Sequence, residues 1–285
     1  MNNEVSFDAL PPPSMAAKAE AIGIKKAQLD FLTMFALAIL AGAFIAIGAI
    51  FCTTVLAGTS SLAYGVARLL GGLVFTTGLI LVVVGGAELF TGNNLIVMAF
   101  ASGKVIFGAL MRNWGIVYVG NFVGSVATAY IMFLSKQYTF GANAIGMTAL
   151  NIGNFKCGFG FTQAVALGIM CNALVCLAVW LCYSARSTGD KILSIIPPIA
   201  AFVAAGFEHS VANMYFIPIS LFVKYFDPAF YTKAVEVAGK DFSNLTWGNF
   251  FGANLLPVTI GNIIGGAAMV GLVYWFAYLR TMKKS

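Results

Sequence analysis

Residues 86–93 read GAELFTGN, and residues 206–213 read GFEHSVAN. Each stretch begins with a glycine, carries a glutamate two residues later and an asparagine five residues after that, within an otherwise apolar region. A polar pattern that occurs twice in apolar surroundings predicts a chain built from two related halves.

A second repeated motif supports this interpretation. Residues 120–124 read GNFVG and residues 261–265 read GNIIG, so the two motifs follow in the same order in both halves. If each half holds three membrane spans, the second half enters the membrane from the opposite side, because three is an odd number. We therefore expect an inverted 3+3 repeat, over about residues 31–135 and 159–280.

The composition is typical of a membrane protein. Of the 285 residues, 60% are hydrophobic and 9% are charged, and the mean hydropathy is +0.90, whereas an average soluble domain is about 25% charged. A span needs roughly 20 apolar residues, so the length predicts one all-α domain with six spans. The polar stretches quoted above predict that the helices of spans two and five are broken. The spans are expected at 31–57, 67–101, 107–135, 159–184, 191–223 and 254–280.

The basic residues indicate orientation. The net charge is +6, but lysines and arginines are scattered in ones and twos, which argues against a nucleic-acid-binding patch. Ten of the sixteen fall in segments on one predicted side, and the positive-inside rule then places both termini in the cytoplasm. These ten are Lys18, Lys25, Lys26, Lys104, Arg112, Arg186, Lys191, Arg280, Lys283 and Lys284.

Residues 1–30 are expected to form a cytoplasmic arm, ahead of a channel domain at 31–285. Pro11–Pro13 should prevent a helix, after which Ser14 can cap one with Met15, Ala19 and Ile22 on one side. A disordered leader is the alternative.

Enzyme chemistry is not expected. The five cysteines are odd in number and lack metal-ligand spacing, so they are interpreted as small buried residues. No nucleophile constellation, metal cluster or cofactor loop is present in the sequence, which predicts no cofactor and no metal.

Glu88 and Glu208 are the carboxylates placed deep in the interrupted spans. They are candidates for a proton or ion site, or for acceptors of the backbone amides that each interruption leaves unpaired. The second role is favoured because the two placements are symmetric. Asn93 and Asn213 are expected to cap the helices that restart there, and a further pair, Asn121 and Asn262, to bond across spans.

His209 is the only histidine, and its counterpart in the first half is Leu89. This asymmetry suggests a titrating role, because imidazole changes charge near neutrality and ionisable groups within a membrane are functional candidates. A structural donor is the alternative. Thr91 and Asn172 are expected to hydrogen-bond to it.

Four apolar residues lie near these polar ones. Phe75 and Leu79 are four residues apart on one helical face, Phe202 precedes His209, and Val175 follows Asn172. Periodicity alone favours core packing for all four.

At these residues the sequence resembles the formate/nitrite transporter family, and within it the bacterial formate channels. The resemblance covers essentially the whole chain and is carried by Glu88 with Phe90 and Thr91, GFEHSVANM, LPVTIGNIIGG from Leu256, the segment around Asn172 and Trp180, and SFDALPPPSMAAKAE.

The resemblance implies an aquaporin-like helix bundle that assembles as a homopentamer in the bacterial inner membrane, with one pore per protomer and contact with membrane lipid. It places His209 at the pore centre beside Thr91 and Asn172, and implies a positive approach formed by Lys156 with Glu208 and Asn213. The implied apolar constrictions are Phe75, Leu79, Leu89, Phe90, Val175 and Phe202.

The predicted function is passive or proton-linked passage of formate and related anions, with nitrite, acetate and lactate as further candidates. In the main hypothesis His209 lends a proton to the anion; in the competing one the anion stays charged beside a cationic His209. A nitrite-selective channel and a facilitator for neutral solutes are the alternatives.

Overall fold

The computed structural model describes residues 8–239 and 241–281, and this part of the chain is all-helical. The first half contains α1 (Pro12–Ala27), α2 (Phe31–Leu56), η1 (Thr59–Ser61), α3 (Tyr64–Gly85), α4 (Phe90–Asn93), η2 (Asn94–Ile96), α5 (Val97–Ala101), α6 (Phe107–Leu134) and η3 (Gln137–Thr139). The second contains α7 (Ala144–Lys156), α8 (Phe161–Ser184), α9 (Thr188–Ala205), α10 (Ser210–Phe226), α11 (Pro228–Ala238), α12 (Trp247–Asn249), η4 (Phe250–Leu255), α13 (Leu256–Ile263), η5 (Ile264–Leu272) and η6 (Trp275–Leu279).

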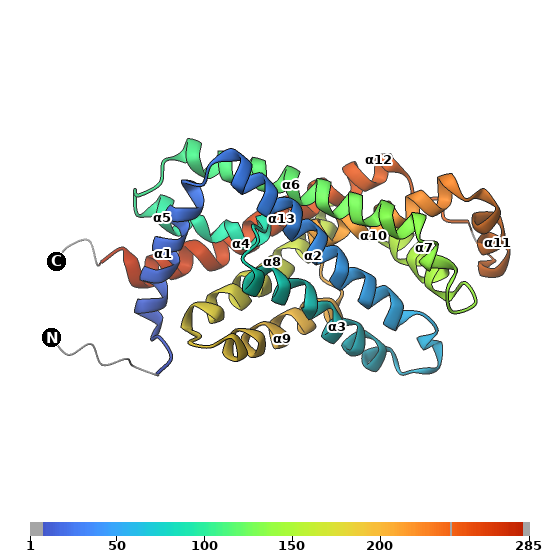
Figure 1. The fold of residues 1–285 in the computed structure, drawn as a ribbon, viewed down its shortest axis with the longest axis horizontal. Helices are drawn as coiled ribbons and strands as arrows, with labels where there is room; N and C mark the ends of the chain where they lie inside the picture. The colour runs from blue at the N-terminus through green and yellow to red at the C-terminus, as the bar shows by residue number, and fades with distance from the viewer. Residues whose placement is uncertain (1–7, 240, 282–285) are drawn as a thin grey trace.

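Within the described residues, six helices are long and apolar enough to cross a membrane. They are α2, α3, α6, α8, α9 and the continuous helix Trp247–Leu279, which confirms the predicted number of spans. Most of the long helices run along or obliquely to the long axis of the molecule, whereas α1 lies across one end, beside the red carboxyl-terminal helix; α7 and α11 lie toward the other end (Figure 1).

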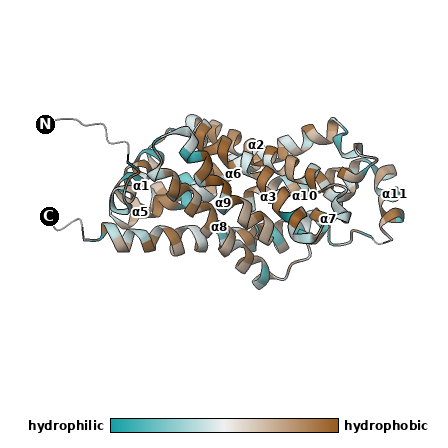
Figure 2. Cartoon of the chain, turned by 90° about the horizontal axis from the view of Figure 1, so that it is seen from below, coloured by the Kyte–Doolittle hydropathy of each residue, from teal (hydrophilic) through white to brown (hydrophobic). Residues whose placement is uncertain are grey.

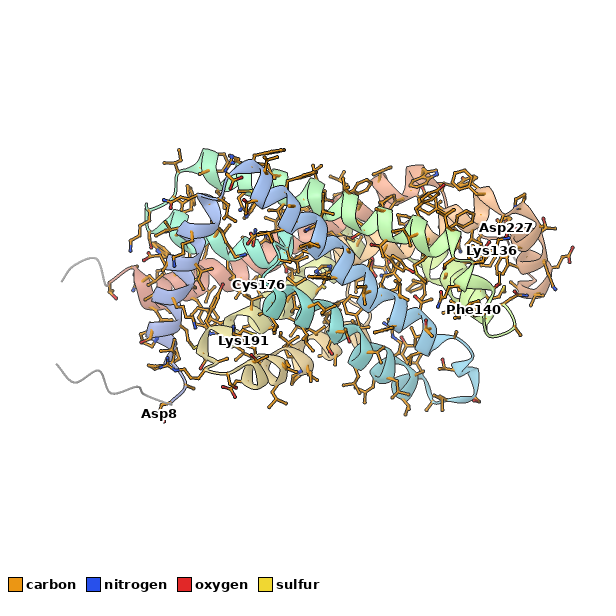
Figure 3. All side chains as sticks on the ribbon, viewed as in Figure 1. Asp8, Lys136, Phe140, Cys176, Lys191 and Asp227 are labelled. Carbon is orange, nitrogen blue, oxygen red and sulfur yellow. The ribbon has the colours of Figure 1, made fainter. Side chains whose placement is uncertain are left out.

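The surface agrees with a membrane location. Brown, hydrophobic residues predominate along the helices (Figure 2). The labelled charged residues lie near the two ends, with Asp8 and Lys191 toward the end of α1, and Lys136 and Asp227 toward the end of α11 (Figure 3). Lys283 and Lys284, two of the ten basic residues used to predict orientation, lie outside the described residues.

Helices approach one another closely at the GNFVG and GNIIG motifs. A methyl group added at Gly124 would overlap the carbonyl oxygen of Ile39 in α2, and one at Gly265 would overlap that of Ile169 in α8. The pairs α2–α6 and α8–η5 therefore pack backbone against backbone.

The chain leaves helical conformation at two related places. α3 ends at Gly85 and α4 begins at Phe90, while α9 ends at Ala205 and α10 begins at Ser210. Gly86 and Gly206 follow the helix ends with φ of +79° and +78°, which glycine adopts without steric cost. α4 and α5 lie on the side of α1, and α10 lies on the side of α7 (Figure 1).

The amino-terminal helix was predicted correctly but its beginning was not. α1 begins at Pro12, with Pro11 as the N-cap residue and no capping bond from a side chain. Proline is tolerated in the first turn because the amides there have no partner within the helix, so Ser14 does not cap it. Met15 and Ala19 are buried against the bundle; residues 1–7 of the predicted arm lie outside the described residues.

Candidate functional site

Asn121 in α6 holds the first interruption. Its Oδ1 accepts the backbone N–H of Phe90 at 2.9 Å, and its Nδ2 donates to the carbonyl oxygens of Glu88 at 2.9 Å and Ala38 at 2.7 Å. Asn121 is fully buried, so these three bonds satisfy backbone groups that water does not reach.

Asn262 does the same for the second interruption. Its Oδ1 accepts the N–H of Ser210 at 2.9 Å, and its Nδ2 donates to the carbonyls of Glu208 at 2.9 Å and Gly168 at 2.8 Å. Asn121 and Asn262 therefore bond across spans as predicted. The expectation that Glu88 and Glu208 accept these amides is wrong, because the asparagine side chains already do so.

The Glu88 carboxylate is bound by side chains instead. Lys26 of α1 lies 2.6 Å from Oε1, and Asn93 donates to Oε2 at 2.7 Å. Asn93 is thus bonded back to the interruption, and it does not cap α4, whose N-cap residue is Leu89.

Glu208 has the equivalent arrangement. Lys156, the last residue of α7, lies 2.6 Å from Oε1, and Asn213 donates to Oε2 at 2.7 Å. The predicted capping role of Asn213 is therefore also wrong. α1 and α7 therefore have equivalent roles in the two halves, because each supplies the lysine that pairs with the glutamate of an interruption. Both helices precede the ranges predicted for the repeats.

The ion pair changes the expected role of Lys156. Its side chain is 14% exposed and its charge is compensated by Glu208, so it does not by itself make the approach positive. Arg68 of α3 lines a cavity together with Lys156. Its guanidinium group donates to the carbonyls of Val203 and Ala204 at the end of α9.

His209 is the N-cap residue of α10. Its Nδ1 accepts the backbone N–H of Ala212 at 3.0 Å, and its Nε2 lies 3.0 Å from the hydroxyl oxygen of Thr91. A backbone N–H can only donate, so Nδ1 carries no proton and a neutral ring carries its proton on Nε2. His209 therefore presents an N–H donor toward Thr91.

Asn172 lies behind Thr91 and not against the imidazole. Its Nδ2 donates to the carbonyl of Thr91 at 3.3 Å, to Oδ1 of Asn94 at 2.9 Å and to the carbonyl of Asn262 at 2.7 Å. Within the described part of the chain no hydrogen bond joins it to His209. Asn172 thus positions the backbone that carries Thr91.

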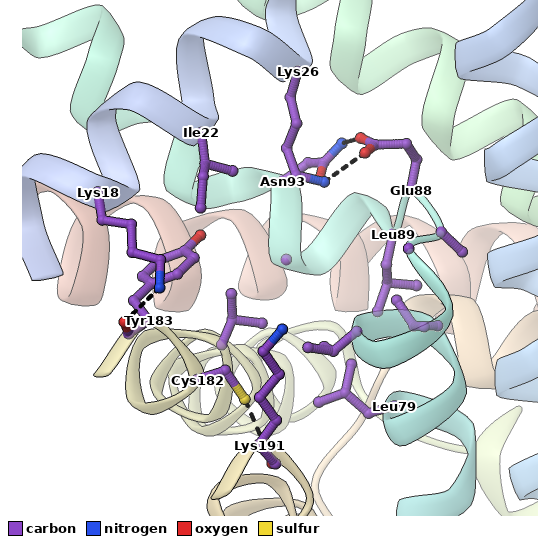
Figure 4. Close-up of a pocket in the computed structure, with 16 residues that line it drawn as sticks. Lys18, Ile22, Lys26, Leu79, Glu88, Leu89, Asn93, Cys182, Tyr183 and Lys191 are labelled. Carbon is purple, nitrogen blue, oxygen red and sulfur yellow. Dashed lines mark hydrogen bonds and ion pairs between the residues drawn. The ribbon is translucent and has the colours of Figure 1, made fainter. Parts of the chain in front are cut away.

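Two cavities approach this centre. The larger, of about 310 Å³, opens beside α1 and is lined by Leu79 and Leu89 (Figure 4). The smaller, of about 90 Å³, is lined by Phe75, Phe202 and His209. Leu79 lines the larger cavity and Phe75 the smaller one, and these two residues are one helical turn, about 6 Å, apart along α3.

Two of the implied constriction residues, Phe90 and Val175, line neither cavity. Phe90 packs edge-to-face on Tyr118, with ring centroids 4.9 Å apart, and Val175 is 1% exposed. Their place in a constriction between the cavities stays a prediction.

Sequence analysis missed several residues at the site. Lys26, Asn113 and Asn254 belong to the carboxylate networks: Asn113 accepts from Asn93, and Asn254 accepts from Asn213. The available signal was the spacing, because Asn113 and Asn121 recur as Asn254 and Asn262 with the same separation.

The fold and the site define a class of protein: an all-helical, multi-pass membrane protein in which two cavities approach a buried polar centre and apolar side chains lie between them. This is the arrangement of a channel or transporter for a small solute. Residues 13–276 match the family model described as formate/nitrite transporter, and the chain belongs to this family.

Individual relatives agree. The chain is 48% identical over 281 residues to the formate channel FocA of Escherichia coli (strain K12), covering 98% of each chain, and 38% identical over 271 residues to the formate channel FocA of Haemophilus influenzae, covering 95% of each. Among solved structures, it is similar to a pentameric formate channel with formate bound (TM-score 0.81, 45% identity, 88% of this chain and 98% of that one) and to an FNT family ion channel (TM-score 0.78, 29% identity, 92% and 98%).

Proposed function

We propose that this protein conducts formate and related small monovalent anions across the bacterial inner membrane, as a homopentamer with a pore in each protomer. The observation that carries the proposal is His209, which lines a cavity together with Phe75 and Phe202 and bonds to Thr91 of the other interruption. The formate channels among its relatives support the choice of substrate.

The apolar side chains between the two cavities decide whether formate crosses as the anion or as the neutral acid. Moving a bare carboxylate into a medium of low dielectric constant costs on the order of 20 kcal/mol in the idealised case, and several kcal/mol after relaxation. Protonating an acid of pKa about 4 at neutral pH costs roughly 4 kcal/mol. Crossing as the neutral acid therefore has the lower barrier.

The N-cap bond controls how His209 takes part. A second proton on the ring must go to Nδ1, which already accepts the N–H of Ala212. A charged ring thus loses its capping bond, at a cost of about 0.5–2 kcal/mol. We infer that His209 is neutral at rest and donates a hydrogen bond from its Nε2–H to the anion. To transfer this proton, the ring must first take up a second proton from water on Nδ1; transfer to the anion then gives formic acid and leaves a neutral ring with its proton on Nδ1.

Two substitutions separate capping from titration. Asn at position 209 can still cap α10, but it does not titrate; Phe can do neither. In proteoliposomes we expect His209→Asn to keep formate flux at low pH and to lose the wild-type pH dependence, and His209→Phe to lose flux as well. An unchanged pH profile in His209→Asn would exclude proton lending.

Current recordings distinguish the two forms of passage. Electroneutral movement of formic acid gives flux with little current, whereas a charged anion beside a cationic His209 gives one elementary charge per formate. Simultaneous recordings of current and flux therefore test the neutral pathway directly.

Substrate range and topology complete the proposal. One proton-donating centre suits nitrite, acetate and lactate as well as formate, so a comparative flux assay over a pH series measures selectivity. We also propose that both termini are cytoplasmic and that residues 1–30 form an arm at the cytoplasmic mouth, which cysteine labelling from either side tests.

A further inference from the structure

The cavity beside α1 carries an excess of positive charge. Lys18 and Lys26 of α1 and Lys191 of α9 line it, together with one carboxylate, Glu88. Figure 4 shows Lys18, Lys26 and Lys191 around the cavity, with the ammonium group of Lys191 directed among the other lining residues.

Only one of the three lysines is neutralised. Lys26 forms the ion pair with Glu88 at 2.6 Å. Residues 8–239 and 241–281 contain three ion pairs, and neither Lys18 nor Lys191 belongs to one. Two ammonium groups therefore face one cavity without a carboxylate partner in the described chain.

Lys18 is held in place, because its ammonium group donates to the carbonyl of Tyr183 near the end of α8 at 2.9 Å. The thiol of Cys182 donates to the backbone carbonyl of Lys191 at 3.6 Å, which fixes the backbone of Lys191 and not its ammonium group. The pKa of Lys18 is lowered by burial and then by the positive charges of Lys191 and Arg186. Their repulsion would be relieved by an anion.

The cavity is too large for formate alone. Its volume of about 310 Å³ is roughly ten times the volume of a water molecule in the liquid and lies at the lower end of the range of small-molecule sites. The cavity at His209 has about 90 Å³, and Arg68 is its one cation outside an ion pair with the described residues. The excess charge and the space are thus particular to the end near α1.

We propose that this cavity is a binding site for a small dianion of the dicarboxylate class, with one carboxylate at Lys18 and the other at Lys191. Charge-assisted hydrogen bonds from two ammonium groups suit two separate carboxylates. Because Leu79 and Leu89 line the same cavity, an occupant blocks the route to the apolar layer. This consequence, inhibition of flux, rests on the function proposed above; the binding itself does not.

Calorimetry with succinate on the purified full-length oligomer in detergent tests the binding. We expect one succinate per protomer, an affinity that decreases with added salt, and much weaker binding of acetate. Lys191→Gln should weaken succinate binding by roughly ten- to a hundredfold, as the loss of one charged hydrogen-bond partner implies.

The matched control is Lys25→Gln, which removes one charge from an exposed position on α1, the helix that carries Lys18. This substitution should change the affinity for succinate by less than about twofold. The side chain of Lys191 makes no bond that holds the fold in the described chain, so its substitution leaves α9 intact; Lys18→Met is the second variant. Equal affinity in wild type, Lys191→Gln and Lys18→Met, or no succinate binding to wild type, would overturn the proposal.

Flux measurements separate this inference from the proposed function. Succinate on the side of α1 should inhibit formate flux in wild-type proteoliposomes and not in Lys191→Gln, while succinate on the opposite side should have little effect. If wild-type protein conducts no formate even when succinate is absent, the channel function is contradicted but the binding site is not. If wild-type protein conducts formate and succinate does not inhibit this flux, the blocking role is contradicted.

Discussion

Replacing Asn262 by leucine tests the reasoning about the interruptions most directly. Leucine has nearly the same size as asparagine, so the substitution removes three hydrogen bonds and changes the packing little. The bonds lost are those to the amide of Ser210 and to the carbonyls of Gly168 and Glu208.

The expected magnitude follows from the number of bonds. Hydrogen bonds between membrane helices contribute about 0.6–1.7 kcal/mol each, so three give a loss of roughly 2–5 kcal/mol in the free energy of unfolding. For a chain of this size the apparent melting temperature should fall on the order of 10 °C. Asn121→Leu should give a similar fall, because Asn121 makes the same three kinds of bond.

Thermal unfolding of the detergent-purified protein, followed by tryptophan fluorescence and by size-exclusion chromatography, measures the effect. Asn151→Leu is the control, since the exposed Asn151 bonds only to a carbonyl of its own helix. Melting of Asn262→Leu within about 2 °C of wild type would refute the idea that these asparagines hold the interruptions.

Three further predictions concern charge and access. Lys156→Met leaves the buried Glu208 carboxylate without its counter-charge and should destabilise the protein by about 3–5 kcal/mol, whereas Lys136→Met, at an exposed position, should not; equal melting of the two would contradict this. The carboxylate of Asp190 accepts hydrogen bonds from the N–H groups of Ser187 and Arg186 and completes the capping box of α9 with Ser187, so Asp190→Ala should increase hydrogen exchange in the first turn of α9 relative to wild type; unchanged exchange would contradict this role. Cys182 and Cys52 line the larger and the smaller cavity, so small methanethiosulfonates should modify each from its own side of the membrane, while Cys157, whose pKa burial raises to about 12, should stay unmodified; labelling of both from one side would contradict separate cavities.

The spans and the two-fold repeat could be predicted because they are written in local patterns. Apolar runs predict helices wherever they occur, and the Gly, Glu and Asn spacing recurs without reference to tertiary contacts. The position of His209 opposite Thr91 was also accessible, since both lie in repeated segments.

The partners of the carboxylates could not be predicted in this way. Lys26 reaches Glu88 from α1, 62 positions earlier in the chain, and Lys156 reaches Glu208 from α7. A single lysine outside a span carries no pattern that identifies its partner. The prediction that Glu88 and Glu208 accept backbone amides was therefore wrong. The sequence does not show that Asn121 of α6 and Asn262 of α13 lie next to the interruptions and accept amides there.

The error at Pro11–Pro13 has a different cause. Proline was interpreted as a helix breaker, which holds in the interior of a helix, but the first turn has no amide bonds to lose. α1 uses this exception at Pro12 and Pro13.

The equivalence of positions 89 and 209 has a consequence for redesign. Both follow a glutamate whose backbone and side chain are secured by an equivalent set of neighbours, and the side chain at 209 adds only the cap of α10. Leucine in one half and imidazole in the other therefore occupy the same frame, and the chemistry of the two halves can differ at a single residue.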